Sequence, residues 1–353
     1  MEPNRYLRRF PIDLQYHAVA ILQRPTVVKS SLERKYIEQM AIHAGMSVGE
    51  LVDEMGKAGV FGAGRLFKAV EIYQRIVSDN EMFKVIGVAG ALIPGGMRKI
   101  IRDLVANEMV DALVLTGANI THELVEAFGW KHEKGIASVG DVALREVGIS
   151  RIFDAYVRDE AFEGFEVKIR DCFEAIAEEK RRSGLASYEL MQEIGMMLHD
   201  DESILKTAAK NGTVIFCPAI FDSILGLHIW MFSQQNELRI DLRKDLQKMI
   251  DTYYESKKVG ALFLGGGVPK NYTLQAAMLT GKALDYAIQI TMDRPEPGGL
   301  SGASLQEAQS WGKVKPEAEW VDVIADATIA FPLMVAATME RMSNKQGEST
   351  EVE

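Results

Sequence analysis

The sequence has few cysteines and no long apolar run, and both absences narrow the class of protein. Its 353 residues include only two cysteines, Cys172 and Cys217, which lie far apart and indicate reduced thiols rather than a disulfide scaffold. No run of about 18 apolar residues occurs, so we expect no membrane span. The opening MEPNRYLRRFPIDLQ contains no apolar signal core, and we therefore expect a cytoplasmic protein.

Signatures of metal binding and of two common enzyme classes are also missing. The chain has six histidines, but none forms a metal-ligand pair at helical spacing and the cysteines do not join them, so we expect no metal site. It has no GxSxG elbow and no Walker-type GK[ST] sequence, which argues against a simple hydrolase and a P-loop protein. Only His122 directly follows a predicted strand end, where it lies either near a site or on a helix surface.

The chain carries an excess of negative charge. Its 40 basic against 50 acidic residues give a formal net charge of −10, which argues against a nucleic-acid-binding protein. A cationic substrate would suit this charge, but a mild acidic excess serves solubility equally well. The charge therefore excludes one class of partner without choosing another.

From residue 83 onward, short β-rich runs alternate with amphipathic helical segments. Most of the runs are continuously apolar, as expected for strands buried on both faces of a parallel sheet. The alternation predicts an open α/β fold with a mostly parallel sheet. The predicted strands are residues 83–90, 111–117, 213–219, 260–266, 285–291 and 321–327, and the predicted helices include residues 96–110, 243–258 and 326–342.

The same pattern divides the chain into segments. Residues 1–60 are predicted as a helical N-terminal segment, in which SSLERKYIEQMAIHAG offers a serine N-cap with Glu33 soon after it. Residues 61–342 form the predicted main domain, with a helical insertion rich in Glu, Lys and Arg at 155–210. The polar residues 343–353 are predicted to be a disordered tail.

Glycine-bearing segments follow several predicted strands, namely GVAGALIPGG, LTGANITHE and LGGGVPKNY. Ligands of such sheets bind at the carboxyl ends of the strands, where glycine lets backbone N–H groups approach a phosphate. Nucleotide binding is therefore the leading interpretation, although GGG at 265–267 also suits a plain tight turn. Asp326, after the last predicted strand, suits either a helix N-cap or a contact to a ribose hydroxyl.

The segment EAQSWGK places Trp311 beside Lys313. A lysine attacks a carbonyl or imine carbon only when it is neutral, and desolvation beside an apolar wall such as Trp311 favours that form. The aromatic face can also hold a cationic amine. From composition alone, a solvated helix end is the more common explanation of such a segment.

An ordered set of motifs resembles the deoxyhypusine synthase family. GVFGAGRLFKAVEIYQRIV, LVLTGANITHELVEAFG and LREVGISRI precede GGGVPKN, DYAIQIT, GGLSGAS, EAQSWGK and VIADATIAFPLMVA, so the resemblance runs from roughly residue 60 to 342. The chain is most similar to the deoxyhypusine synthase-like subgroup, which is marked by GGGVPKN and GGLSGAS.

The resemblance implies a doubly wound NAD-binding fold and a homotetramer built from tight dimers, with sites at the dimer interface. It also implies the chemistry. NAD takes a hydride from a carbon beside a polyamine nitrogen, a diamine leaves, and an aminobutyl group passes to an enzyme lysine as a Schiff base. An acceptor amine then displaces that lysine, and the stored hydride reduces the new imine.

The family's site residues carry over to matched positions in this chain. The resemblance makes Lys313 the nucleophile, Trp311 the site tryptophan and Glu307 the acidic residue of the same segment. Met292 and Asp293 differ in residue type from the cofactor stretch that they match. The implied NAD contacts are Gly90, Ala91, Leu92, Ile93, Pro94, Thr116, Gly117, Ala118, Asp222, Gly266, Met292, Asp293, Asp326 and Ala327.

The positions that read the substrate depart from the family. Two acids that hold the positive ends of spermidine are replaced, by Leu227 in DSILGL and Leu300 in GGLSGA. A buried ammonium needs an anion or good acceptors, so the usual means of holding spermidine is missing. The other matched positions are Thr121 and His122 in place of paired glutamates, Asn271 in place of a histidine, and Gly298 and Gly299.

Three functions remain open at this point. The first is NAD-dependent aminobutyl transfer from a polyamine to a small amine such as putrescine, because EAQSWGK is kept beside Leu227 and Leu300. The second is authentic deoxyhypusine synthesis, in which the acceptor is a protein lysine, and the lost acids argue against it. The third is a non-catalytic NAD-binding protein, against which the retained Trp311 and Lys313 argue.

Overall fold

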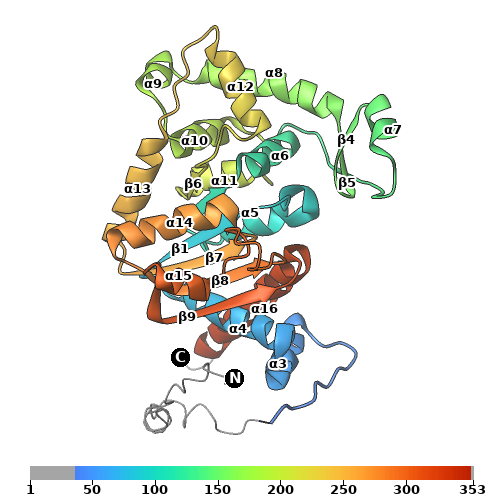
Figure 1. Ribbon diagram of the computed structural model, residues 1–353, viewed down its shortest axis with the longest axis vertical. Helices are drawn as coiled ribbons and strands as arrows, with labels where there is room; N and C mark the ends of the chain where they lie inside the picture. Colours follow the sequence, from blue (N-terminus) through green and yellow to red (C-terminus); the bar gives the residue numbers. More distant parts are fainter. Residues whose placement is uncertain (1–35, 351–353) are drawn as a thin grey trace, which may run out of the picture. The chain divides into compact units, whose positions relative to one another are not determined.

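The structure is a computed structural model, and it describes residues 36–350, with side chains through residue 344. The chain divides into two compact units, Met1–Glu38 and Gln39–Glu353, and the second contains the fold (Figure 1). At its centre is a 6-stranded parallel sheet with the order β6-β2-β1-β7-β8-β9. Its strands are β1 (Met82–Val88), β2 (Ala112–Leu115), β6 (Val214–Phe216), β7 (Lys258–Leu264), β8 (Leu284–Thr291) and β9 (Val314–Ile324).

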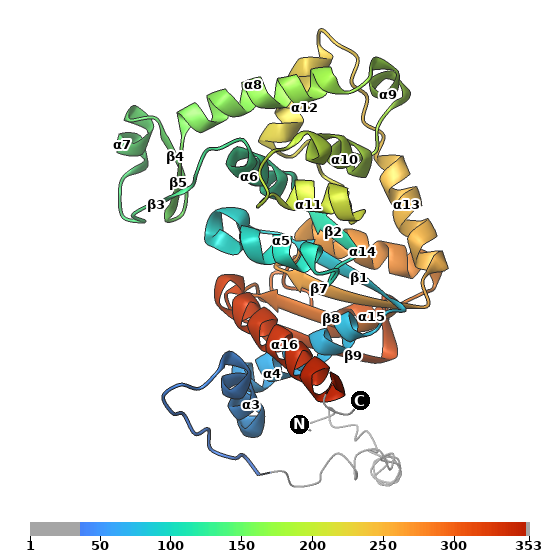
Figure 2. The same ribbon diagram turned by 180° about the vertical axis from the view of Figure 1, so that it is seen from behind.

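Helices cover both faces of this sheet, which explains the continuously apolar strands. Ile86 and Val88 of β1 join one buried apolar cluster, whereas Val85 joins the other. Figure 1 shows one set of helices in front of the sheet and Figure 2, from behind, shows the opposite set. The first set is α13 (Leu242–Glu255), α14 (Gly267–Thr280) and α15 (Leu305–Ser310), and the second includes α4 (Phe61–Ser78), α5 (Arg98–Ala106) and α16 (Ala327–Thr350). The predicted α/β fold and all its predicted strands are confirmed.

The strand order reverses between β1 and β7. The chain builds β1, β2 and β6 outward in one direction, then returns to β7, β8 and β9 in the other. The turns after the two central strands meet, since the N–H of Ala89 donates to the carbonyl of Leu264 at 2.9 Å. Ligands of doubly wound sheets bind at such a reversal, so the loops after β1 and β7 mark the expected cofactor edge.

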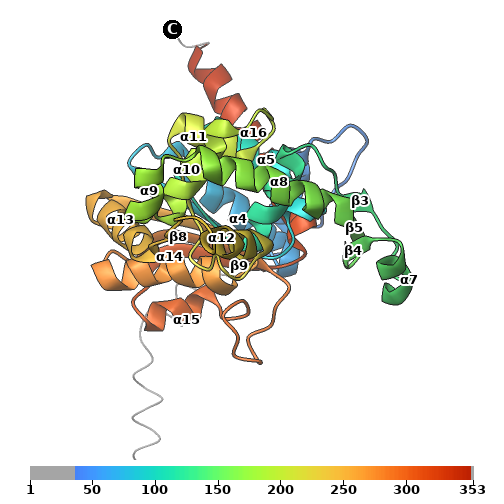
Figure 3. The same cartoon turned by 90° about the horizontal axis from the view of Figure 1, so that it is seen from above.

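Helices dominate the segment between β2 and β6, but a small antiparallel sheet lies among them, between α6 and α8. The helices are α6 (Gly117–Ala127), α7 (Asp141–Glu146), α8 (Asp159–Ala175), α9 (Glu178–Ser183), α10 (Ser187–Met197) and α11 (Ile204–Asn211). Figure 3 shows the small sheet, with α7 beside it, apart from the main sheet. Its strands are β3 (Glu133–Lys134), β4 (Ile149–Ile152) and β5 (Ala155–Arg158). The prediction of helix was therefore wrong at 155–158, where the chain pairs with β4 across a turn at Phe153.

Predicted and observed secondary structure also differ near both ends of the described residues. Residues 36–46 are not helical, and α3 (Val48–Ala58) begins only after Ser47, whose side chain and Glu50 form the capping box. The capping box at Ser47 and Glu50 therefore sets the first residue of α3. Residues 1–35 of the predicted helical segment, including its serine N-cap, lie outside the described residues. At the other end α16 extends to Thr350 and so includes residues 343–350 of the predicted tail; no proline or glycine interrupts residues 333–346, and Gly347 lies within the helix.

Helix α3 belongs to the same compact unit as the sheet. The hydroxyl of Ser47 donates to Glu340 of α16 at 2.6 Å, and the N–H of Gly49 donates to the same carboxylate at 2.9 Å. Both cysteines are free, as predicted, and both are buried. Within residues 36–350, no helix is long and apolar enough to cross a membrane.

Candidate active site

A cavity of about 340 Å³ lies between α14 and α15. One face of α14 lines it with Asn271, Leu274, Gln275 and Met278, which recur at helical spacing. The facing wall contains Ser304, Glu307, Ala308 and Trp311, and the cavity is completed by Lys270, Leu300, Ala303 and Lys313. The structure therefore brings together the predicted residues Lys313, Trp311, Glu307, Asn271 and Leu300.

The local chain geometry at Lys313 follows from a short helix that ends in glycine. Ser304 caps α15 by accepting the N–H of Glu307 at 3.1 Å. Gly312 has φ 66°, a left-handed conformation that a side chain disfavours, and it turns the chain directly into β9. The result places the Lys313 Nζ atom 5.6 Å from the centre of the Trp311 ring, within the range of a cation–π contact.

A second lysine of this cavity was missed by the sequence reasoning. Lys270, in the quoted motif GGGVPKN, is 3% exposed, and its Nζ atom donates to Gln289 Oε1 at 3.0 Å and to the carbonyl of Ala303 at 2.5 Å. Burial lowers the pKa of Lys270 to about 8, while Asp322 and Glu307 attract the charge and Lys313 repels it. Apolar residues around a lysine in the first turn of a helix were the available signal.

The carboxylates near the cavity are few. Glu307 lines it directly, and Asp322 of β9 accepts the N–H of Leu305 at 3.2 Å from beneath α15. Burial raises the pKa of Asp322 above its ordinary value, against opposing hydrogen bonds and the charge of Lys270. At the position where the family pattern has an acid, Leu300 is 48% exposed. The cavity thus has an apolar mouth and one lining carboxylate.

The residues predicted to contact NAD follow the carboxyl ends of the six main strands and do not line this cavity. Gly90 to Pro94 follow β1, Thr116 to Ala118 open α6, and Gly266 precedes α14. Asp222 follows β6, and Met292 and Asp293 follow β8. Asp326 accepts the N–H of Thr328 at 2.8 Å, so it serves as the N-cap of α16, and Ala327 is the first residue of that helix.

Two observations at this edge fit a dinucleotide. A Cβ at Gly266 would lie 2.4 Å from Ser301 Cα, so only glycine allows the two backbones to approach there. Asn119 donates to the carbonyl of Gly90 at 2.9 Å and to Thr116, but its buried Oδ1 atom has no protein partner. An unsatisfied buried acceptor calls for a donor, which a ribose hydroxyl or a carboxamide would supply.

Helix α6 places two predicted substrate residues differently. Thr121 is buried, and its hydroxyl donates to the carbonyl of Gly117 and accepts the N–H of Leu225, so it joins α6 to α12 (Ile224–Ser233). His122 is half-buried, and its Nδ1 atom lies 2.9 Å from Nε2 of His132. Burial and the neighbouring His132 lower the pKa of His122 to about 4, against the attraction of Glu126. Sequence reasoning found His122 but not the histidine that orients it.

The remaining predicted substrate residues lie away from α6. Leu227 on α12 is 57% exposed. Gly298 and Gly299 lie between β8 and α15, in the exposed segment that leads to Leu300. Within the described residues, no group of three or more His, Cys, Asp or Glu side chains is placed to hold a metal ion.

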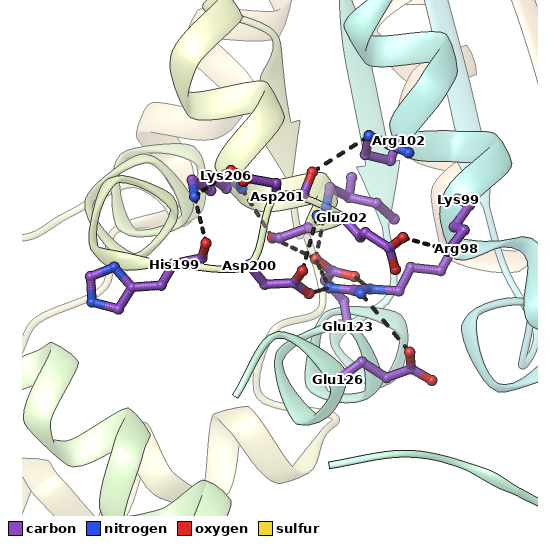
Figure 4. A network of polar contacts seen from close by, with 12 residues as sticks. Arg98, Lys99, Arg102, Glu123, Glu126, His199, Asp200, Asp201, Glu202 and Lys206 are labelled. Carbon is purple, nitrogen blue, oxygen red and sulfur yellow. Dashed lines mark hydrogen bonds and ion pairs between the residues drawn. The ribbon is translucent and has the colours of Figure 1, made fainter. Parts of the chain in front are cut away.

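A buried ionic network holds α5, α6 and the start of α11 together (Figure 4). Arg98 of α5 pairs with Glu123 of α6 at 2.5 Å and with Asp200 at 2.7 Å. The hydroxyl of Ser203 and the N–H of Ile204 donate to the same Glu123 carboxylate at 2.7 and 2.8 Å. This network fixes the helix that carries Thr121 and His122.

The family model of deoxyhypusine synthase matches residues 50–338 of this chain. The chain belongs to the deoxyhypusine synthase family. It is 47% identical over 300 residues to "Probable deoxyhypusine synthase 1" of Methanosarcina acetivorans, covering 85% of this chain and 93% of that protein. It is 44% identical over 306 residues to "Probable deoxyhypusine synthase" of Methanothermobacter thermautotrophicus, covering 87% and 98%.

Membership of the deoxyhypusine synthase family makes the protein a transferase of aminobutyl groups. The fold agrees with the crystal structure of a "putative deoxyhypusine synthase from Entamoeba histolytica". That structure aligns with a TM-score of 0.60 at 21% identity and covers 84% of this chain and 94% of its own. The family as a whole acts on polyamines with NAD as cofactor.

Proposed function

We propose that this protein transfers an aminobutyl group from a polyamine, with Lys313 as the nucleophile and a small amine as the acceptor. The observation that carries the proposal is the convergence of Lys313, Trp311 and Glu307 on one cavity. A primary amine beside an aromatic wall can hold the transferred group as an imine. Glu307 supplies an anion for an incoming ammonium.

The loops at the carboxyl edge of the sheet are the proposed NAD site. Gly266 gives backbone access, and Asn119 Oδ1 and Asp326 offer acceptors to hydroxyl or amide donors. The N–H groups at the start of α6 would be available to a phosphate. NAD, when bound, takes up and returns the hydride of the reaction. The chain's own contribution is to position the amine and to exclude water from the Lys313 imine.

A second copy of the chain completes the site in this proposal. Lys313 directly precedes β9, whereas the proposed cofactor residues follow the strands, and they do not share a cavity within one chain. The exposed apolar residues Leu227 and Trp230 on α12, together with Trp311, offer surface for such a copy. The family's homotetramer of tight dimers, with sites at the interface, would place one copy's cofactor edge against its partner's Lys313.

The proposed acceptor follows from the apolar positions. Leu300 lines the cavity mouth where the family's pattern has an acid, and Leu227 is likewise apolar. A site with fewer carboxylates can bind fewer ammonium groups, so it suits a small amine better than a long polycation. A protein lysine is the second candidate acceptor, because the named relatives are called deoxyhypusine synthases.

Trapping with borohydride tests the nucleophile. The protein is incubated with NAD and spermidine or another polyamine, reduced, digested and mapped by mass spectrometry. We expect an aminobutyl adduct on Lys313, and none in Lys313→Arg, which keeps the charge but is a poor nucleophile. Binding of NAD without an adduct on Lys313 across the polyamine panel would favour a non-catalytic NAD-binding protein.

Competition between acceptors tests the transfer. The unreduced Lys313 imine is offered putrescine, related diamines, and the translation factor whose lysine is the family's acceptor, and no borohydride is added before the acceptor. We expect transfer to a free diamine, and reintroducing acids by Leu227→Asp with Leu300→Asp should improve binding of spermidine. Labelling of the factor at a higher rate than any diamine would assign the protein-lysine acceptor instead.

A further inference from the structure

Lys270 faces the same cavity as Lys313, and its contacts leave one position of its nitrogen free. Nζ is bonded to Cε and donates to Gln289 Oε1 at 3.0 Å and to the Ala303 carbonyl at 2.5 Å. The fourth tetrahedral position holds a third proton when the amine is charged and a lone pair when it is neutral. Because Lys270 lines the cavity, a molecule bound there would contact the nitrogen at this remaining position.

The orientation of the Gln289 amide is fixed by its other partners. Its Nε2 atom donates to the carbonyls of Gly265 at 3.1 Å and Ser301 at 2.8 Å. Both amide protons are therefore used, and Oε1 must point at Lys270 as an acceptor. A neutral Lys270 then satisfies both acceptors with its two protons and loses no hydrogen bond on deprotonation.

The charges around Lys270 are balanced in a way that leaves its proton exchangeable. No carboxylate is bonded to its ammonium, although Asp322 of β9 and Glu307 of α15 attract it and Lys313 repels it. Burial lowers its pKa to about 8, close to the pH at which proton transfer by a side chain is most effective. Among the other side chains that line the cavity, the ionisable ones are Glu307 and Lys313, and Lys313 is already used as the nucleophile.

We propose that Lys270 is the proton-transfer residue of the second half-reaction, in which the acceptor amine displaces Lys313. This inference rests on the proposed function. The acceptor ammonium gives one proton to neutral Lys270, and its freed lone pair forms a bond to the imine carbon. A second proton passes from the acceptor nitrogen to the Lys313 nitrogen as the bond between Lys313 and that carbon breaks. Lys313 leaves as a neutral amine, the protonated imine now joins the acceptor, and Lys270 holds the first proton.

The deciding variant is Lys270→Arg, which keeps a cation and two donors for Gln289 and Ala303 but cannot give up its proton. Lys270→Met removes both functions. The matched control is Lys282→Met, because Lys282 also donates to two carbonyls, those of Tyr254 and Ser256, but does not line the cavity. Thermal unfolding of each variant checks that it is folded. If Lys270→Met does not fold, the result for Lys270→Arg alone tests the proposal.

The measurement isolates the transfer step. The Lys313 adduct is formed first, acceptor is then added, and loss of the borohydride-trappable adduct is followed between pH 6.5 and 9.5. For wild type and Lys282→Met we expect a rate that rises with pH and levels off above about pH 8. For Lys270→Arg and Lys270→Met we expect the adduct to form but its transfer to slow by about 100-fold or more, with that pH dependence lost.

If Lys270→Arg transfers the group at the wild-type rate and with the wild-type pH profile, the proposal is overturned. Lys270 would then only hold the loop that carries Ala303. Absence of the Lys313 adduct in wild type would instead overturn the proposed function. A substrate-free titration keeps the two failures distinct. Lys270 is followed by NMR after reductive ¹³C-methylation, and a midpoint near the ordinary lysine value of 10.5 would count against proton transfer by Lys270 whatever the substrate.

Discussion

Among the described residues, the two buried cations, Arg98 and Lys270, have contrasting surroundings. Arg98 lies between the carboxylates of Glu123 and Asp200, and Figure 4 shows the ion pairs that join it to both. Lys270 is equally inaccessible, but its direct partners are a side-chain amide and a backbone carbonyl, both neutral. One cation is fully compensated, and the other is solvated only by dipoles.

The comparison shows that the partners of a buried cation determine whether its role is structural or chemical. A buried charge with bonded counter-charges keeps its proton and holds the elements that supply them. A buried amine with neutral acceptors has a proton that it can lose at little cost in hydrogen bonding, which suits it to chemistry. The four predictions below test whether the two surroundings differ as much as their contacts imply.

The largest expected effect is on Arg98. Arg98→Met should lower the free energy of unfolding by about 3–5 kcal/mol, because it leaves the fully buried Glu123 carboxylate without its cation. Denaturant unfolding followed by circular dichroism measures this. Glu123→Gln is the matched variant, and it should cost less, because Ser203 and Ile204 can still donate to the amide oxygen. If Arg98→Met lowers the free energy of unfolding by less than about 1 kcal/mol, Arg98 and Lys270 would not differ in their contribution to stability.

His122 provides an intermediate case, a half-buried titratable ring whose direct partner is a second histidine. The pKa of His122 is about 4 in the folded protein against an ordinary value of 6.5, so the unfolded chain binds the proton first as pH falls. Stability should therefore fall between about pH 6.5 and 4, by about 2–3 kcal/mol from this group. His122→Gln cannot titrate and should show a flatter dependence of the free energy of unfolding on pH. An unchanged slope would show that His132 or the carboxylates determine it.

The sequence predicted the parallel sheet and the Lys313 side of the cavity, but it did not predict the roles of Lys270 and Arg98. Continuous apolar runs such as the one in β7 identify buried parallel strands, and the motif around Lys313 identified one wall of the cavity. Lys270 escaped notice because its role depends on Gln289 and Ala303, which lie far along the chain and meet it only after folding. The same holds for Arg98 and Asp200, whose pairing depends on tertiary packing rather than on spacing.

Local signals that compete also limited the prediction. The predicted serine N-cap near residue 30 lies outside the described residues, whereas Ser47 and Glu50, which the sequence analysis did not single out, form a capping box at the start of α3. The hairpin at Phe153 overrode the helical character of its charged neighbours, because β4 and β5 pair their backbones. Which local preference forms the final structure depends on tertiary contacts, and these cannot be seen in a single sequence.

A smaller effect is expected when Lys270 is replaced. At pH 7 Lys270→Met removes a poorly compensated charge but leaves Gln289 Oε1 and the Ala303 carbonyl without a donor, so stability should stay within about 1 kcal/mol of wild type. The folded pKa of about 8 lies below the ordinary 10.5, so the unfolded chain binds more protons between these values. Wild type should therefore gain stability relative to the variant as pH rises from 8 toward 10. Denaturant unfolding at pH 7 and 9.5 measures both, and a loss of 3 kcal/mol at pH 7 would contradict the contrast with Arg98.

The smallest effect should come from a cation that is not buried. Arg170 on α8 pairs with Glu166 one turn away at 3.6 Å, and both side chains are largely exposed. Water solvates both charges, so Arg170→Met should change the free energy of unfolding by less than about 0.5 kcal/mol, and added salt should reduce even that. Set beside Arg98→Met, this variant separates the loss of an arginine from the loss of a buried ion pair. If both cost the same, desolvation would not be what distinguishes the network around Glu123, and the neutral surroundings of Lys270 would lose their significance.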